Sequence, residues 1–254
     1  MIADGRRILL EVAIASADDA VAAQQGGADR VELNAALWLG GLTPSLGAMV
    51  EARARTTLPI VAMVRPRGGG FAYSESEFST MRRDVDFLLA HGAEGIAFGI
   101  LNDRGEIDEP RCRQIVSQVG PHHQAVFHRA FDVVPDPFLA LETLIGLGMR
   151  RVMTSGQEEN AYNGAERIAA LIAGAAGRIE ILPAGGINRF TLADVLSRTG
   201  CDQVHASLKG TRPDRSTATR PRIAFGGVLR PPEDRYDATD PSAVAEVRER
   251  LSGR

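Results

Sequence analysis

The chain has 254 residues, of which 44% are hydrophobic, and its formal net charge is −3. It contains no apolar run of about 18 residues, which predicts no membrane span. The absence of a basic excess and of clustered aromatic residues argues against nucleic-acid binding. The only cysteines, Cys112 and Cys201, are too few for a disulfide framework and favour a reduced, cytoplasmic location.

Eight short apolar segments bounded by turn residues recur along the chain, and their ends lie 21 to 34 residues apart. One strand–helix unit needs about 30 residues. Eight such units favour a closed parallel barrel over an open sheet. The predicted strands are Ile8–Val12, Arg30–Leu33, Ile60–Val64, Gly95–Phe98, Ala125–His128, Arg151–Thr154, Ile179–Pro183 and Gln203–Ala206. We therefore predict an α/β fold, a (β/α)8 TIM barrel that forms a single domain over residues 1–254.

Capping residues indicate where helices begin and end between these strands. Ser16 with Asp19 resembles a capping box. Three further caps each precede a proline, the residue favoured at the first helical position: Thr43, Asp136 and Asp240. Glycines predict helix ends at Gly26, Gly92, Gly148 and Gly200. Residues 207–239 predict a long loop, either a functional lid or a poorly ordered segment, before a final helix at 241–251.

Charged and imidazole side chains occur near predicted strand ends, where a barrel lining is normally apolar: Glu11, Glu32, Arg65, His128 and His205. Burying such groups alone is costly, so they should pair with each other or with a ligand. Strands eight, one and two are neighbours in a closed barrel, which predicts that His205, Glu11 and Glu32 meet. A structural network of these charges remains the alternative to a functional site.

The loops after the strands add further candidates for catalysis and for anion binding. Catalytic candidates are Glu11 or Glu32 as general base and His128 as acid or electrophile, with Asp132 nearby. The candidate anion-binding residues are Arg65, Arg67, Arg129, Thr154, Ser155, Gly185, Gly186, His205 and Ser207. A glycine pair after strand seven often cradles a phosphate, although paired glycines also simply turn a chain. This set fits an isomerase, epimerase or lyase acting on a small anionic or phosphorylated metabolite. The sequence has no G-x-G-x-x-G nucleotide-binding fingerprint, which indicates that no organic cofactor is used.

Several segments carry a family resemblance: Arg30–Asn34, Gly40–Ser45, Arg65–Ser74, Phe127–Asp132 and Thr154–Gln157. They resemble the signature blocks of the CutC-type copper-homeostasis family, from about residue 8 to about residue 210. The resemblance implies a cytosolic TIM barrel, an association with copper and a tendency to form homo-oligomers. It does not supply a reaction.

The sequence departs from that family at positions that bear on copper. Family members often carry cysteines just after strand one and after the Glu-Leu pair of strand two, where this chain has Val12–Ile14 and Asn34. Cu(I) prefers thiolate and thioether ligands, and we interpret Met63 and Met153 as core residues. A soft Cu(I) site is therefore predicted to be absent. A harder divalent ion could instead be held by His128, His205, Glu11 and Glu32. Trp38 could line a pocket or a subunit contact.

Overall fold

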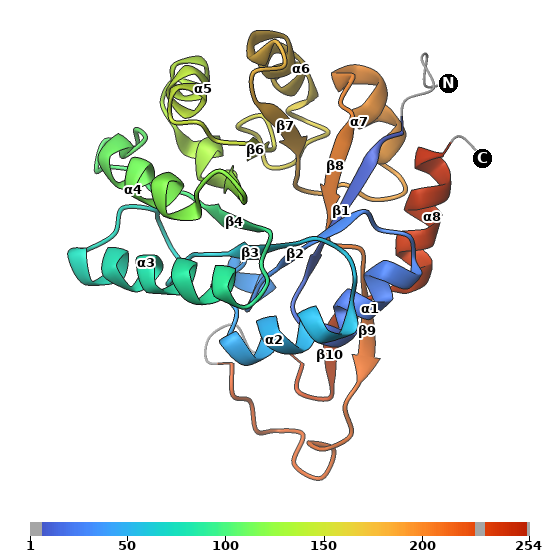
Figure 1. The fold of residues 1–254 in the computed structure, drawn as a ribbon. Helices are drawn as coiled ribbons and strands as arrows, with labels where there is room; N and C mark the ends of the chain where they lie inside the picture. The colour runs from blue at the N-terminus through green and yellow to red at the C-terminus, as the bar shows by residue number, and fades with distance from the viewer. Residues whose placement is uncertain (1–6, 227–231, 253–254) are drawn as a thin grey trace.

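The computed structural model describes residues 7–226 and 232–252, and it confirms the predicted TIM barrel. Eight parallel strands lie in the order β7-β6-β5-β4-β3-β2-β1-β8 and are surrounded by helices (Figure 1). β7 and β8 lie next to each other and close the ring, although no hydrogen-bonded ladder joins them. The strands are β1 Leu9–Ile14, β2 Arg30–Leu33, β3 Ile60–Met63, β4 Gly95–Phe98, β5 Gln124–Phe127, β6 Arg151–Thr154, β7 Glu180–Pro183 and β8 Gln203–Ala206.

The helices follow the strands in alternation. They are α1 Ala17–Gln25, α2 Leu46–Arg55, α3 Glu75–Ala90, α4 Glu109–Val119, α5 Pro137–Gly146, α6 Ala165–Ala175, α7 Leu192–Thr199 and α8 Pro241–Leu251. Ser16, Asp136 and Asp240 cap their helices as predicted. The cap predicted at Thr43 is wrong, because Ser45 caps α2 and the Thr43 hydroxyl instead accepts a hydrogen bond from the Arg65 backbone N–H at 3.0 Å. No helix in these residues is long and apolar enough to cross a membrane.

The first strand is longer than the sequence indicates, and this changes the position of Glu11. β1 continues to Ile14, so Glu11 lies in the middle of the strand and not at its end. In the ladder with β8, Glu11 is the register partner of His205. Glu11 therefore lies one layer below the rim of the barrel, and its 1% exposure reflects this depth.

The segment predicted as a loop over 207–239 contains an antiparallel pair of strands, β9 Lys209–Pro213 and β10 Arg235–Thr239. Figure 1 shows this hairpin extending from the barrel below α1 and α2. Because its side chains are mostly polar and exposed, the hairpin has no apolar alternation from which it could be predicted. Residues 227–231 of the predicted loop lie outside the described residues.

Candidate functional site

A cavity of about 750 Å³ lies at the carboxyl ends of the barrel strands, the place where TIM barrels carry their sites. Its lining combines apolar groups with polar and charged side chains from β2, β3, β5 and β8 and from the loops that follow them. The polar members include Glu32, Asn34, Arg65, His128, Arg129, Asp132, His205, Ser207 and Lys209. Most of the residues predicted for the site therefore surround one cavity.

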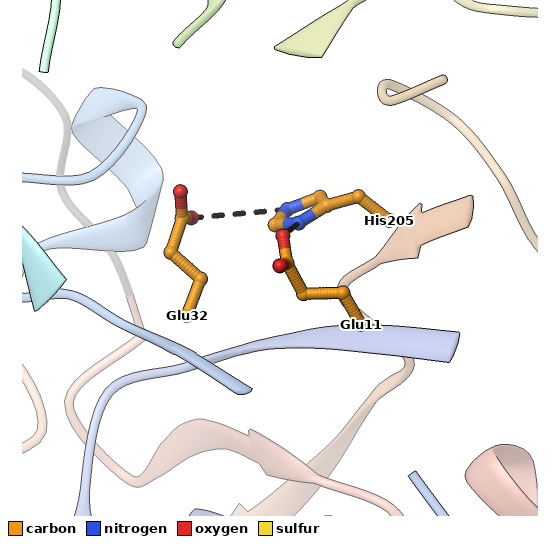
Figure 2. A group of neighbouring side chains, drawn as sticks. All are labelled: Glu11, Glu32 and His205. Carbon is orange, nitrogen blue, oxygen red and sulfur yellow. Dashed lines mark hydrogen bonds and ion pairs between the residues drawn. The ribbon is translucent and has the colours of Figure 1, made fainter. Parts of the chain in front are cut away.

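His205 lies between two carboxylates on neighbouring strands (Figure 2). Its Nδ1 is 2.7 Å from Glu11 Oε1, and its Nε2 is 3.8 Å from Glu32 Oε2. The contact with Glu11 is a hydrogen bond, whereas the distance to Glu32 is too long for one. Glu32 Oε2 accepts a hydrogen bond from Asn34 Nδ2 at 3.0 Å, and the buried Glu32 Oε1 has no partner among the described residues. The Glu32 carboxyl and His205 Nε2 are thus free to interact with a ligand.

Burial and neighbouring charges shift these three groups in different directions. Burial by itself raises the pKa of Glu11, but the ion pair with Arg30 and the hydrogen bond to His205 outweigh it and lower the pKa. Burial raises the pKa of Glu32, and the charge of Glu11 adds to that rise against the opposing effect of His205. Burial lowers the pKa of His205, but Glu32 and Glu11 together raise it above its usual value. Glu11 is therefore ionised and accepts a hydrogen bond from the Nδ1–H of His205, while Glu32 and His205 Nε2 compete for another proton.

A buried polar layer below the cavity holds Glu11 in place. Arg30 Nε donates to Glu11 Oε2, and Arg30 Nη2 donates to Gln203 Oε1 at 2.6 Å. Arg151 Nε donates to the same Gln203 oxygen at 3.1 Å and to Glu180 Oε2 at 2.8 Å. None of these four residues was predicted as a site residue. Arg30, Arg151, Glu180 and Gln203 are the first residues of β2, β6, β7 and β8. Polar residues at the first position of several strands were the signal in the sequence that could have identified this layer.

Hydrogen bonding fixes the form of the His128 imidazole. His128 Nδ1 accepts a hydrogen bond from the Ala130 backbone N–H at 3.1 Å, so in the neutral ring the proton is on Nε2. Burial, together with the nearby Arg65 charge, lowers the pKa of His128 to about 3. Nε2 is buried without a partner among the described residues. His128 therefore offers the cavity a neutral hydrogen-bond donor.

Gly99 makes room for this ring. A Cβ atom at Gly99 would lie 2.4 Å from His128 Cε1 and 2.8 Å from Ala130 Cβ. No real Cβ tolerates such approaches, so any side chain here would displace the imidazole. The position of His128 thus depends on the absence of a side chain on the neighbouring strand end.

Arg65 is a buried guanidinium that binds backbone carbonyls. Its Nη1 donates to Leu39 O at 2.8 Å and to Gly41 O at 3.2 Å, and its Nη2 donates to Gly69 O at 2.7 Å. No described carboxylate forms an ion pair with it. Arg65 therefore ties together the loops after β2 and β3 and brings an uncompensated positive charge to the cavity wall.

Arg67, also predicted to bind an anion, is not among the residues that line the cavity. Its Nε lies 2.5 Å from Glu77 Oε1, and its Nη2 donates to Ala72 O at 2.8 Å. The two arginines of the Arg-Pro-Arg segment thus have different surroundings. Arg65 is buried beside the cavity, and Arg67 organises the loop that leads into α3.

Asp132 is occupied by hydrogen bonds from the loops after β5 and β6. Its carboxylate accepts from Thr154 Oγ1 at 2.6 Å, from Ser155 N at 2.9 Å and from Arg129 Nε at 2.7 Å. Thr154 and Ser155 are fully buried and are not among the cavity-lining residues, whereas Arg129 is. This arrangement makes Asp132 an organiser of the loops, with its lone pairs already used. Gly185, Gly186 and Ser207 line the opposite part of the cavity, after β7 and β8.

The donors present do not fit a Cu(I) site. Cys112 is buried in α4 with its Sγ 3.7 Å from Ile100 O, and Cys201 precedes β8 at the opposite end of the barrel. Met63 and Met153 line the cavity, but they pack in separate apolar clusters, Met63 with Val126 and Met153 with Leu182, so neither cluster brings two thioethers together. A cluster of Glu11, Glu32 and His205 places three ligand atoms within 4.8 Å of one another. However, both Glu11 oxygens are already bound, by Arg30 and by His205.

The chain is similar to CutC proteins over nearly its whole length. The CutC family model matches residues 8–210. A CutC family protein of Treponema denticola is 45% identical over 95% of this chain and 98% of its own. A human copper homeostasis protein cutC homolog is 39% identical over 93% of this chain and 86% of its own. The crystal structure of a CutC protein from Streptococcus agalactiae has a TM-score of 0.73 and 30% identity, and it covers 78% of this chain and 97% of its own. This chain belongs to the CutC family.

Proposed function

We propose that this protein is a cofactor-independent acid–base enzyme that acts on a small anionic carbonyl compound. The main support for this proposal is a group of buried polar atoms that have no hydrogen-bond partner among the described residues. The group includes Glu32 Oε1, Asn34 Oδ1 and His128 Nε2. All three side chains line the same cavity. Leaving buried polar atoms unpaired costs free energy, and a bound ligand would supply the missing partners.

In the proposed reaction, Glu32 and His205 transfer the proton. Burial raises the pKa of Glu32, and a carboxylate of raised pKa is a stronger base than an ordinary one. Glu32 removes a proton from the carbon next to the ligand's carbonyl group, and the electron pair of that C–H bond forms a C=C bond. The carbonyl oxygen then carries the negative charge. In a hydroxycarbonyl compound, return of the proton to the former carbonyl carbon, together with transfer of the neighbouring hydroxyl proton to the oxyanion, completes an isomerisation. Return of the proton to the other face of the original carbon completes an epimerisation.

His128 and Arg65 stabilise the oxyanion in this scheme. The Nε2–H of His128 is a fixed donor, because Nδ1 is held by the Ala130 N–H. A neutral imidazole can act as an electrophile toward a developing enolate, and the positive charge of Arg65 stabilises the same negative charge. Glu11 does not contact the ligand in this scheme and acts as a positioning residue for His205.

A place in copper homeostasis is proposed from the names of the relatives. No step of the mechanism uses the metal, because the cavity lacks thiolates and the Glu11 oxygens are occupied. The copper association of this chain is therefore proposed to be indirect, through the chemistry of the small-molecule site.

The test is hydrogen exchange with solvent. Phosphorylated and unphosphorylated ketoses, aldoses and sugar acids are first screened by thermal shift, because a ligand of the native state raises the melting temperature. Compounds that bind are incubated in D2O, and loss of the C–H signal next to the carbonyl is followed by proton NMR. We expect exchange with the unaltered protein and a fall of about 10²- to 10⁴-fold in Glu32→Gln.

The matched control is Glu51→Gln, the same change on the exposed face of α2. It should exchange at the rate of the unaltered protein. The proposal is wrong if no binder in the panel exchanges, or if Glu32→Gln, still folded by circular dichroism, exchanges as fast as the control.

A further inference from the structure

The edge of the cavity between β7 and β8 presents unused backbone donors. Because no hydrogen-bonded ladder joins β7 to β8, the residues that follow the two strands are not paired with each other. The backbone N–H groups in question donate to no described residue, and they belong to Gly185, Gly186 and Ile187 after β7 and to Ser207 and Leu208 after β8. All five residues line the cavity.

The backbone turns sharply at three of these residues. Gly185 and Gly186 have φ of 95° and 70°, and Leu208 has φ of 47°, which is unusual for a residue with a branched side chain. A Cβ atom at Gly186 would lie 3.0 Å from Asn160 Cβ, so a larger residue would crowd this turn. Rows of free N–H groups in such turns commonly bind anions.

Positive side chains lie beside this row of donors. Arg129 uses Nε for Asp132 and Nη2 for Ser155 Oγ, and its Nη1 approaches Gly185, where a Cβ atom would be 3.1 Å away. Lys209 lines the cavity at the start of β9, and its Nζ is 3.5 Å from Asp237 Oδ2, a long and weak contact. Arg129 Nη1, which forms no hydrogen bond with a described residue, and the weakly held Lys209 Nζ can therefore donate to an anion at the β7–β8 edge.

We propose that the β7–β8 edge of the cavity binds the phosphate group of the substrate. Backbone N–H groups with cationic side chains form the donor set that a doubly charged phosphate monoester requires. The inference rests on the proposed function and narrows its substrate to phosphorylated hydroxycarbonyl compounds. The phosphate would lie after β7 and β8, and the carbonyl would lie between Glu32 and His128 on the other side of the same cavity.

The experiment uses the fact that Lys209 is the only lysine in the chain. Protein labelled with ¹³C at lysine Cε gives one side-chain signal, which is followed while inorganic phosphate is added at constant ionic strength. We expect a saturable shift of this signal and a rise in melting temperature that equal ionic strength of chloride does not produce. Lys209→Gln should weaken phosphate binding about 5-fold, because one charged contact at a partly exposed site is lost.

The matched control is Arg212→Gln, which removes one positive charge from the exposed part of the same strand. It should bind phosphate like the unaltered protein. The inference is wrong if phosphate causes no more change than chloride, or if the control weakens binding as much as Lys209→Gln does.

Two further measurements separate this inference from the proposed function. Glu32→Gln should keep its affinity for inorganic phosphate while losing hydrogen exchange. Phosphate binding without exchange of any compound would refute the proposed reaction and leave the phosphate site standing. Equal exchange rates for phosphorylated and unphosphorylated forms of one compound would refute the phosphate site and leave the reaction standing.

Discussion

Glu11 and His205 are register partners on β1 and β8, and their side chains form a 2.7 Å hydrogen bond inside the barrel. The same carboxylate is paired on its other side with Arg30. Glu11 therefore connects a structural layer with the cavity, and the form of His205 that faces the ligand depends on it.

Glu11→Gln should lower the pKa of His205, because the substitution removes a negative charge that raises it. It should also lower the free energy of unfolding by about 3–5 kcal/mol, the usual cost of leaving a buried ion-pair partner alone. The measurements are ¹⁵N NMR titration of the imidazoles and urea unfolding. An unchanged His205 titration in folded Glu11→Gln would contradict this account of the pair.

Glu32→Gln should remove a pH dependence of stability. The pKa of Glu32 is raised in the folded protein, so the folded state binds more protons than the unfolded state above pH 4.5. Stability then falls as the pH rises from 4.5 through the raised pKa of Glu32. Thermal melts across this range should show a smaller decrease in the variant. If the two curves are parallel, Glu32 is not a buried carboxyl of raised pKa.

His128 should remain neutral throughout the physiological range. The pKa of His128 is about 3 in the folded protein and 6.5 in the unfolded protein, so between these values the unfolded state binds more protons. The free energy of unfolding therefore decreases as the pH falls from 6.5 toward 3. Imidazole ¹⁵N shifts between pH 5 and pH 8 should show Nε2 protonated and no titration of this ring. A midpoint near 6.5 would contradict the structure.

Gly99→Ala should disturb His128 without touching the ligand itself. The new methyl group would overlap the imidazole, and such overpacking costs about 1–3 kcal/mol. We expect a lower urea midpoint and a changed Nε2 shift. Gly146→Ala is the control, since a Cβ there meets no atom within 4 Å. Equal stability of the two variants would show that the ring has room to move.

Cu(I) titration against a bathocuproine competitor should reveal no tight stoichiometric complex. The cavity has no thiolate, and burial raises the pKa of Cys112, which keeps that thiol protonated. Cys112→Ala should behave like the unaltered protein in this assay. A one-to-one complex that resists the competitor would overturn the conclusion that these donors do not fit Cu(I).

Much of the fold could be predicted because the apolar segments have a clear period. Seven of the eight strands have boundaries equal to or within one residue of the predicted ones, for example Arg30–Leu33 and Gly95–Phe98. The end of β1 was missed because Val12, Ala13 and Ile14 continue an apolar run without a turn residue. The hairpin of β9 and β10 could not be predicted, since an exposed polar strand carries no periodic signal.

The candidate site could be predicted in part, because strand order brings Glu11, Glu32 and His205 together in any closed barrel. What each residue does could not be predicted. The fixed tautomer of His128 depends on one backbone N–H, and the carbonyl contacts of Arg65 depend on two loop conformations. The hydrogen bonds to Asp132 come both from its own loop and from the end of β6. These are properties of distance and angle, which residue types alone do not specify.

The missing hydrogen-bonded ladder between β7 and β8 has a consequence for how ligand recognition can evolve. Any residue except proline supplies a main-chain N–H, so donors at Ile187 and Ser207 persist whichever side chain follows them. The main-chain part of anion recognition at this edge therefore does not depend on which side chains Ile187 and Ser207 carry, while the opposite wall depends on the identity of Glu32. Proteins that evolve from this barrel can acquire a different reaction and still bind the anionic group of their ligands at the same edge.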